Sequence, residues 1–189
     1  MLAPEKNILR NPLLVVVDMQ LGFLNESSLP VVPSVLRLLH ECERLTLPIV
    51  FTKFINRPGS AFEILLDWKR VREKPEIDLH GAFTESGHKL LEKNYYTAFT
   101  DEFDNLINRE NCRTLLISGI STESCVLKTA LDAFERGLRP VVVSDACASD
   151  QGPQVHLHAL KLIRAMIGIR QVRTIDEVVR ALNPKDQTV

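Results

Sequence analysis

The feature that most constrains this chain is a series of short apolar runs rich in Val, Ile, Leu and Thr. Charged or turn-forming residues bound each run, and none shows strict polar alternation. The four runs are Leu13–Val17, Pro48–Phe54, Thr114–Ser118 and Pro140–Ser144. Strands of a parallel sheet are buried on both faces, so they appear in sequence as continuous runs of this kind. The runs therefore predict a mostly parallel sheet.

The segments between these runs show helical spacing. Apolar residues recur at that spacing from Val35 to Leu45 and again over Val155–Ile167, and a short helix is expected at Glu85–Glu92. Parallel strands need crossover connections, which are usually helices that cover both faces of the sheet. We therefore expect the α/β class, as a three-layer α/β/α Rossmann-like sandwich around a central, mostly parallel sheet of about six strands.

The 189 residues, of which 45% are hydrophobic, suit one domain spanning residues 1–189. Residues 55–83 mix turn residues and charges without a period, so we expect a variable excursion on the substrate side of the sheet. Residues 183–189 form a polar tail. No linker or internal repeat suggests a second domain.

Composition and motifs exclude several classes of partner. With 23 basic and 24 acidic side chains and no basic run, nucleic acid is not expected as a partner. The Leu13–Val17 run is far shorter than the roughly 20 apolar residues of a membrane span. No glycine-rich phosphate loop follows a strand, so no nucleotide cofactor is expected. Four cysteines without a C-x-x-C pair suit a reducing cytoplasm.

Ligands of parallel α/β proteins bind beyond the carboxyl ends of the strands. Cys125 follows one such end, in the expected first turn of a helix, where free N–H groups and the helix dipole favour a thiolate. The same N–H groups would suit an oxyanion. The alternative is that Cys125 is a small buried core residue.

Asp18 ends the first apolar run, where a buried carboxylate is costly unless it is paired. It would accept a proton from a thiol, or it would serve as a helix cap or loop hydrogen-bond acceptor. Lys93 ends the helix expected at Glu85–Glu92, where a lysine is ordinarily a solvated cap. Cys147 follows another strand and would border a pocket or act as a structural thiol.

Three segments together resemble the isochorismatase-like cysteine hydrolases, a family that includes nicotinamidases, N-carbamoylsarcosine amidohydrolases and isochorismatase. They are DMQLGF at 18–23, KNYYTAF at 93–99 and GISTESCV at 119–126. The likeness continues through the helix, strand and loop after the cysteine and through H-x-x-A-L at 156–160. It covers most of the chain except residues 55–83.

The resemblance implies a role for each motif residue. Cys125 would be the nucleophile, Asp18 the general base and Lys93 the cation that holds and polarises them. A cis peptide bond between Ile120 and Ser121 would turn the Ser121 N–H toward the substrate, beside that of Cys125, to form an oxyanion hole. The resemblance also implies a homodimer or homotetramer.

The function expected from these residues is hydrolysis of a C–N bond in a small amide, carbamoyl or ureido substrate through a thioester. One alternative is vinyl-ether hydrolysis of isochorismate type, which depends on Asp18 and Lys93 and can dispense with the cysteine. Another is a ligand-binding or thiol-sensing module without turnover. The retained Cys125 favours the thioester chemistry.

Two features concern the substrate and the metal. Nicotinamidases of this family place a metal site after the second strand, within D-x-H-P, whereas FTKFINRPGSAF at 51–62 contains no histidine, so no catalytic metal is expected. Candidates for the substrate wall are Phe23, by motif match, and Phe54, Asn56, Arg57 and Trp68, by location. Arg57 would bind a carboxylate, although a packing or surface role for Asn56, Arg57 and Trp68 is an equal alternative.

Overall fold

The computed structural model of the chain describes residues 9–183, so most of the expected tail at 183–189 lies outside the described residues. Six strands in this range form one parallel sheet in the order β3-β2-β1-β4-β5-β6. Their bounds are β1 Pro12–Val17, β2 Ile49–Phe54, β3 Lys89–Lys93, β4 Thr114–Ile120, β5 Arg139–Ala148 and β6 Val172–Arg173. The predicted α/β class and the parallel sheet are confirmed.

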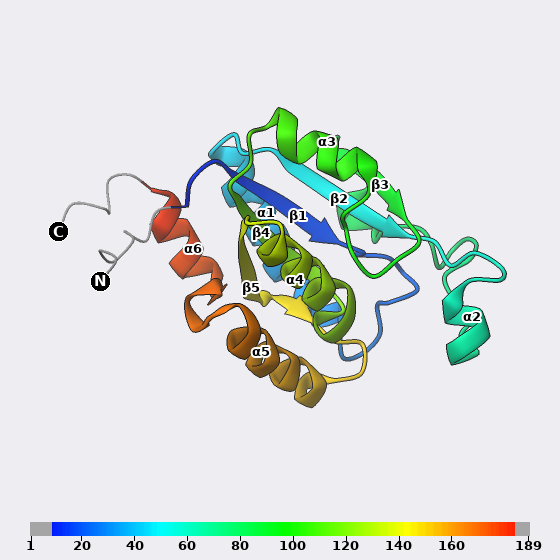
Figure 1. The fold of residues 1–189 in the computed structure, drawn as a ribbon. Helices are drawn as coiled ribbons and strands as arrows, with labels where there is room; N and C mark the ends of the chain where they lie inside the picture. Colours follow the sequence, from blue (N-terminus) through cyan, green and yellow to red (C-terminus); the bar gives the residue numbers. More distant parts are fainter. Residues whose placement is uncertain (1–8, 184–189) are drawn as a thin grey trace.

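Six α-helices in the described range accompany the sheet (Figure 1). They are α1 Val32–Arg44, α2 Ala61–Leu66, α3 Asp101–Arg109, α4 Leu127–Glu135, α5 Pro153–Ile167 and α6 Ile175–Leu182. Short 3-10 turns span Leu29–Val31, Gly81–Phe83 and Ile169–Gln171, and a π-helical turn spans Thr122–Val126. No helix in the described part of the chain is long and apolar enough to cross a membrane.

The alternating side chains of β1 divide the core into the two expected layers. Leu13 and Val15 pack in one hydrophobic cluster with α3, α4 and α5, whereas Leu14 and Val16 pack in another with α1 and α6. Both sets of β1 side chains are fully buried, as a central parallel strand requires. The helices therefore cover both faces of the sheet.

The helix predicted at Glu85–Glu92 is wrong. Residues Lys89–Lys93 form β3, an edge strand paired in parallel with β2. Leu91 and Lys93 are buried while Leu90 and Glu92 are exposed, which is the two-residue period of a strand with one covered face. The adjacent leucines obscured that period. Lys93 thus lies at the carboxyl end of a strand, beside Phe54, and not at the end of a helix.

Residues 55–83 form an excursion beyond the carboxyl ends of β2 and β1. It carries α2, which projects at the right of Figure 1. Glu76 fastens it internally by accepting hydrogen bonds from the Val71 N–H at 2.6 Å and from Arg70 Nε at 2.9 Å. Arg70 also donates to the Gly22 carbonyl at 2.9 Å, so the excursion is attached to the segment that follows β1.

Candidate active site

Asp18 directly follows β1, and its carboxylate is completely buried. The Thr52 hydroxyl on β2 donates to Oδ1 at 2.6 Å and accepts a 3.2 Å hydrogen bond from the Asp18 N–H. Neighbouring strands therefore hold both the backbone and the side chain of Asp18. This arrangement leaves Oδ2 directed toward a second partner.

That partner is Lys93, whose Nζ lies 2.7 Å from Asp18 Oδ2. The ammonium also donates to the carbonyls of Tyr95 and Tyr96 at 3.0 and 3.1 Å and to Cys125 Sγ at 3.5 Å. Burial is the largest single effect and would lower the pKa of Lys93, but the charge and hydrogen-bond interactions with Asp18 and Cys125 together outweigh it and raise the pKa. Lys93 is therefore positively charged at neutral pH.

Cys125 lies in the π-helical turn between β4 and α4. Loss of solvent around the thiol raises its pKa to about 12; the Lys93 charge opposes this, while the Asp18 charge and hydrogen bond reinforce it. The expectation of a thiolate is therefore corrected, because desolvation and a neighbouring carboxylate outweigh the free N–H groups. A pKa this high favours the neutral thiol over the thiolate at neutral pH.

The end of β4 approaches β1 unusually closely at Gly119. This residue has φ +111°, and a Cβ atom there would lie 2.1 Å from the Val17 carbonyl oxygen. Only glycine combines this conformation with this contact. The following peptide bond, Ile120–Ser121, is cis, at the position that the family resemblance implies. Gly119 pairs with Val17, so the cysteine turn, which begins at Thr122, starts close to the end of β1 and to Asp18.

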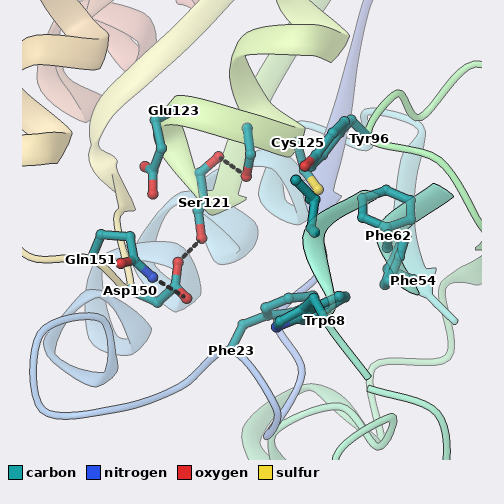
Figure 2. Close-up of a pocket in the computed structure, with 12 residues that line it drawn as sticks. Phe23, Phe54, Phe62, Trp68, Tyr96, Ser121, Glu123, Cys125, Asp150 and Gln151 are labelled. Carbon is teal, nitrogen blue, oxygen red and sulfur yellow. Dashed lines mark hydrogen bonds between the residues drawn. The ribbon is translucent and has the colours of Figure 1, made fainter. Parts of the chain in front are cut away.

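A cavity of about 300 Å³ opens above the thiol. Figure 2 shows its two unlike sides, with Cys125 between them. The apolar side consists of Phe23, Phe54, Phe62, Leu66, Trp68 and Tyr96, and the polar side of Ser121, Glu123, Ser124, Asp150 and Gln151. Phe23 and Trp68 stack with their ring centroids 6.1 Å apart. The cavity suits a small molecule with a flat apolar part.

Three of the five predicted wall residues line this cavity, namely Phe23, Phe54 and Trp68. Asn56 does not; it is buried beneath the excursion, where its amide donates to the carbonyls of Trp68 at 2.8 Å and Arg70 at 3.2 Å. Arg57 is exposed and lies outside the cavity lining, so the carboxylate-binding role considered for it is not supported.

Several lining residues were not identified from the sequence. Asp150 and Gln151 lie two and three residues beyond the end of β5, where ligands of parallel α/β proteins bind. Tyr96 lies in the KNYYTAF segment, and Glu123 and Ser124 lie in GISTESCV. Nothing in these segments distinguishes a side chain that lines the cavity from one that does not. Phe62 and Leu66 belong to the aperiodic excursion, in which no pattern distinguishes lining residues from exposed ones.

Cys147 and His156 lie outside the cavity lining. The Cys147 thiol is buried against the Ile117 carbonyl, with Sγ and oxygen 3.7 Å apart. His156, the first residue of the H-x-x-A-L segment, is hydrogen-bonded through Nδ1 to the Thr122 hydroxyl at 2.8 Å. It joins the start of α5 to the cysteine turn.

The donor set after β2 does not fit a metal ion. Phe54, Asn56 and Arg57 occupy that position, and none offers the imidazole or carboxylate that a divalent cation prefers. Across residues 9–183, no three His, Cys, Asp or Glu side chains come together in a group that could hold a metal ion. The segment after β2 therefore does not reproduce a metal site of the nicotinamidase kind.

Comparisons with known proteins agree with this geometry. The Isochorismatase domain family matches residues 12–175. Isochorismatase family protein 1B of Dictyostelium discoideum is 32% identical over 116 residues, 60% of this chain and 50% of that protein, so the chain matches about half of that relative's length. Nicotinamidase 3 of Arabidopsis thaliana is 25% identical over 178 residues, 89% of this chain and 87% of that protein.

Among solved structures, the cysteine hydrolase from Pseudomonas syringae pv. phaseolicola 1448A has a TM-score of 0.79 at 21% identity, covering 96% of this chain and 98% of that chain. At 21% identity, this structural similarity shows a shared fold and nothing about activity. The family match, in contrast, extends over most of the sequence and includes all three motifs. The chain therefore belongs to the isochorismatase-like hydrolase family.

Proposed function

We propose that this protein is a cysteine hydrolase that cleaves the C–N bond of a small amide, carbamoyl or ureido compound through a thioester. The observation that carries the proposal is the position of Lys93 Nζ, 2.7 Å from Asp18 Oδ2 and 3.5 Å from Cys125 Sγ, below the cavity. A carboxylate, an ammonium and a thiol in mutual contact are the groups that a base-activated nucleophile requires. The nicotinamidase relative supports an amide as the substrate.

In the first half of the reaction, Asp18 takes the proton of the Cys125 thiol as sulfur attacks the carbonyl carbon. A C–S bond forms, and the N–H groups of Ser121 and Cys125 hold the oxyanion. The C–N bond then breaks, and the amine leaves with the proton that Asp18 carried. A thioester remains on Cys125.

In the second half, water attacks the thioester and gives a proton to Asp18. The C–S bond breaks, the acid product departs, and the sulfur recovers its proton from Asp18. Lys93 stays charged throughout and stabilises the negative charge as it moves between the Asp18 carboxylate and the sulfur of Cys125. A thiol with a pKa of about 12 needs such a base, because almost none of it is ionised at neutral pH.

The vinyl-ether alternative fits the cavity less well. Isochorismate-type substrates carry carboxylates, and none of the described residues that line the cavity is Lys, Arg or His. The cavity instead carries Glu123 and Asp150, which would repel such a substrate. No contact among the described lining residues favours an anionic ligand over a neutral amide.

The test is to screen small primary amides, carbamoyl compounds and ureas for release of ammonia or amine, and to search acid-quenched samples for an acyl group on the Cys125 peptide. We expect turnover and a Cys125 adduct in the wild type, and neither in folded Cys125→Ala. Cys112→Ala is the matched control, since Cys112 is buried at the other end of the sheet and should retain activity. Turnover that persists in Cys125→Ala would exclude the thioester route.

A further inference from the structure

The polar side of the cavity carries two carboxylates and no cation. Glu123 and Asp150 line it together with Ser121, Ser124 and Gln151, and none of the described lining residues is basic. Lys93 does not offset them, because its charge is paired with Asp18 below the cavity at 2.7 Å. A ligand in this space therefore meets a negative field on one side.

Asp150 is fixed in position as an acceptor. The Ser121 hydroxyl donates a hydrogen bond to Oδ1, and the Gln151 amide donates to Oδ2 at 3.4 Å (Figure 2). Asn25 additionally holds the main chain by donating to the Asp150 carbonyl at 2.8 Å. Each carboxylate oxygen still has lone pairs beyond these bonds, so the group can accept hydrogen bonds from a ligand without giving up its own contacts.

Glu123 offers a second acceptor whose bonding is incomplete. The Ser149 hydroxyl donates to Oε1 at 2.8 Å, whereas Oε2 is buried and has no hydrogen-bond partner among residues 9–183. Burial has the largest effect and raises the pKa of Glu123; hydrogen bonds from its own N–H and from Ser149 lower it, and the charge of Asp150 adds a smaller upward effect. A cation nearby would offset both upward effects. Buried carboxylate oxygens normally have partners, so Oε2 is the oxygen of this group left to accept a further hydrogen bond.

The opposite side of the cavity suits the same kind of ligand. Phe23 and Trp68 stack there, and Phe62 and Tyr96 pack edge to face with their centroids 4.9 Å apart. Aromatic faces attract cations and accommodate flat carbon skeletons. Carboxylates on one side and aromatic rings on the other therefore favour a substrate that is both apolar and positively charged.

We propose that the cavity selects amides whose body carries a positively charged nitrogen group, such as an ammonium or amidinium, with Asp150 and Glu123 as its acceptors. The aromatic side packs against the carbon skeleton, and Cys125 faces the amide carbonyl. This inference rests on the proposed function and specifies its substrate class.

The test uses three aromatic amides with one skeleton, in which a ring substituent is an aminomethyl cation, a neutral hydroxymethyl group or a carboxylate. We expect kcat/KM to be about tenfold or more higher for the cationic amide than for the neutral one, with the anionic amide slowest. In Asp150→Asn and Glu123→Gln the ratio of cationic to neutral kcat/KM should fall toward one. Glu135→Gln, which removes the same charge from the exposed face of α4, should keep the wild-type ratio.

A binding measurement separates this inference from the proposed function. In Cys125→Ala, quenching of Trp68 fluorescence reports binding of each amide without turnover. If the wild type hydrolyses all three amides without charge preference, or prefers the anion, the inference is overturned while the proposed function stands. A second outcome is that no amide is hydrolysed, the cationic amide binds most tightly, and Asp150→Asn abolishes this difference in affinity. The selection of positive charge then stands, and the hydrolase proposal fails. Equal or absent binding of the three amides overturns the inference.

Discussion

Single residues decide how the thiol at the centre of this site is activated. Cys125 and Asp18 are buried together, so the proton they exchange responds to every nearby charge. Lys93 contacts both groups, with its Nζ 2.7 Å from Asp18 Oδ2 and 3.5 Å from Cys125 Sγ. Burial has the largest effect on the pKa of the thiol, and these two neighbours then change it in opposite directions.

Changing these neighbours one at a time should move the pKa of Cys125 in opposite directions. Asp18→Asn removes a negative charge and should lower the pKa from about 12, whereas Lys93→Met removes a positive charge and should raise it. The measurement is the rate of iodoacetamide labelling of Cys125 against pH by peptide mass spectrometry. Both variants should lose turnover. If both variants shifted the pKa of Cys125 in the same direction, the opposite effects assigned to Asp18 and Lys93 would be wrong.

Cys112 provides the internal reference for that experiment. Its pKa is raised to about 11, mainly by burial, and it lies at the start of β4, away from Asp18 and Lys93. Its labelling profile should therefore be the same in the wild type and both variants. A change at Cys112 would indicate general loosening of the fold, not a local charge effect.

At the scale of elements, the excursion over residues 55–83 builds the apolar side of the cavity. The Asn56 side chain makes three hydrogen bonds inside the excursion. Its amide donates to the Trp68 and Arg70 carbonyls, and its Oδ1 accepts from the Ser60 hydroxyl at 2.6 Å. A loop can hold an aromatic side chain in place only if its own carbonyls have partners. Asn56 thereby positions Trp68 without touching the cavity.

Asn56→Ala should therefore weaken substrate binding more than chemistry. Two loop carbonyls lose their donors, which costs about 1–3 kcal/mol locally, and Trp68 becomes mobile. We expect KM to rise several-fold with kcat little changed, and the anisotropy of Trp68 fluorescence to fall. Arg57→Ala, at the adjacent exposed position, should change neither quantity. A variant with unaltered anisotropy would show that other contacts hold the loop.

The free energy of unfolding of the whole molecule should depend on pH through His156, which connects α5 to the cysteine turn. Burial lowers the pKa of His156, which is hydrogen-bonded to Thr122. Below the ordinary value of about 6.5, the unfolded chain binds a proton that the folded chain does not. The free energy of unfolding should therefore decrease as pH falls from about 6.5 through the lower pKa of the folded state.

The measurement is urea unfolding between pH 7.5 and pH 5, followed by far-UV circular dichroism. His156→Gln should flatten this part of the pH profile, because glutamine keeps a hydrogen-bonding group but does not titrate. His158→Gln is the control, since His158 is exposed on the same helix. A profile unchanged by His156→Gln would assign the acid sensitivity to other groups.

The sequence by itself determined the fold class and placed Asp18 and Cys125 at the carboxyl ends of strands. Buried parallel strands produce continuous apolar runs, and their carboxyl ends meet at one edge, so the pattern of runs alone located Asp18 and Cys125 there. The helix wrongly predicted before Lys93 shows the limit of this reasoning. A five-residue edge strand with two adjacent leucines has too short a pattern, and only its pairing with β2 defines it.

Only the tertiary structure decided the charge state of the thiol and the composition of the cavity. The pKa of Cys125 depends on the complete removal of solvent and on two charges that are distant in sequence, and none of these is a local property. The cavity likewise combines Phe62 and Trp68 of the excursion with Asp150, which follows β5. Local patterns predict elements, because propensity and periodicity act over a few residues. Long-range packing sets electrostatics and specificity, because these depend on which side chains share a space.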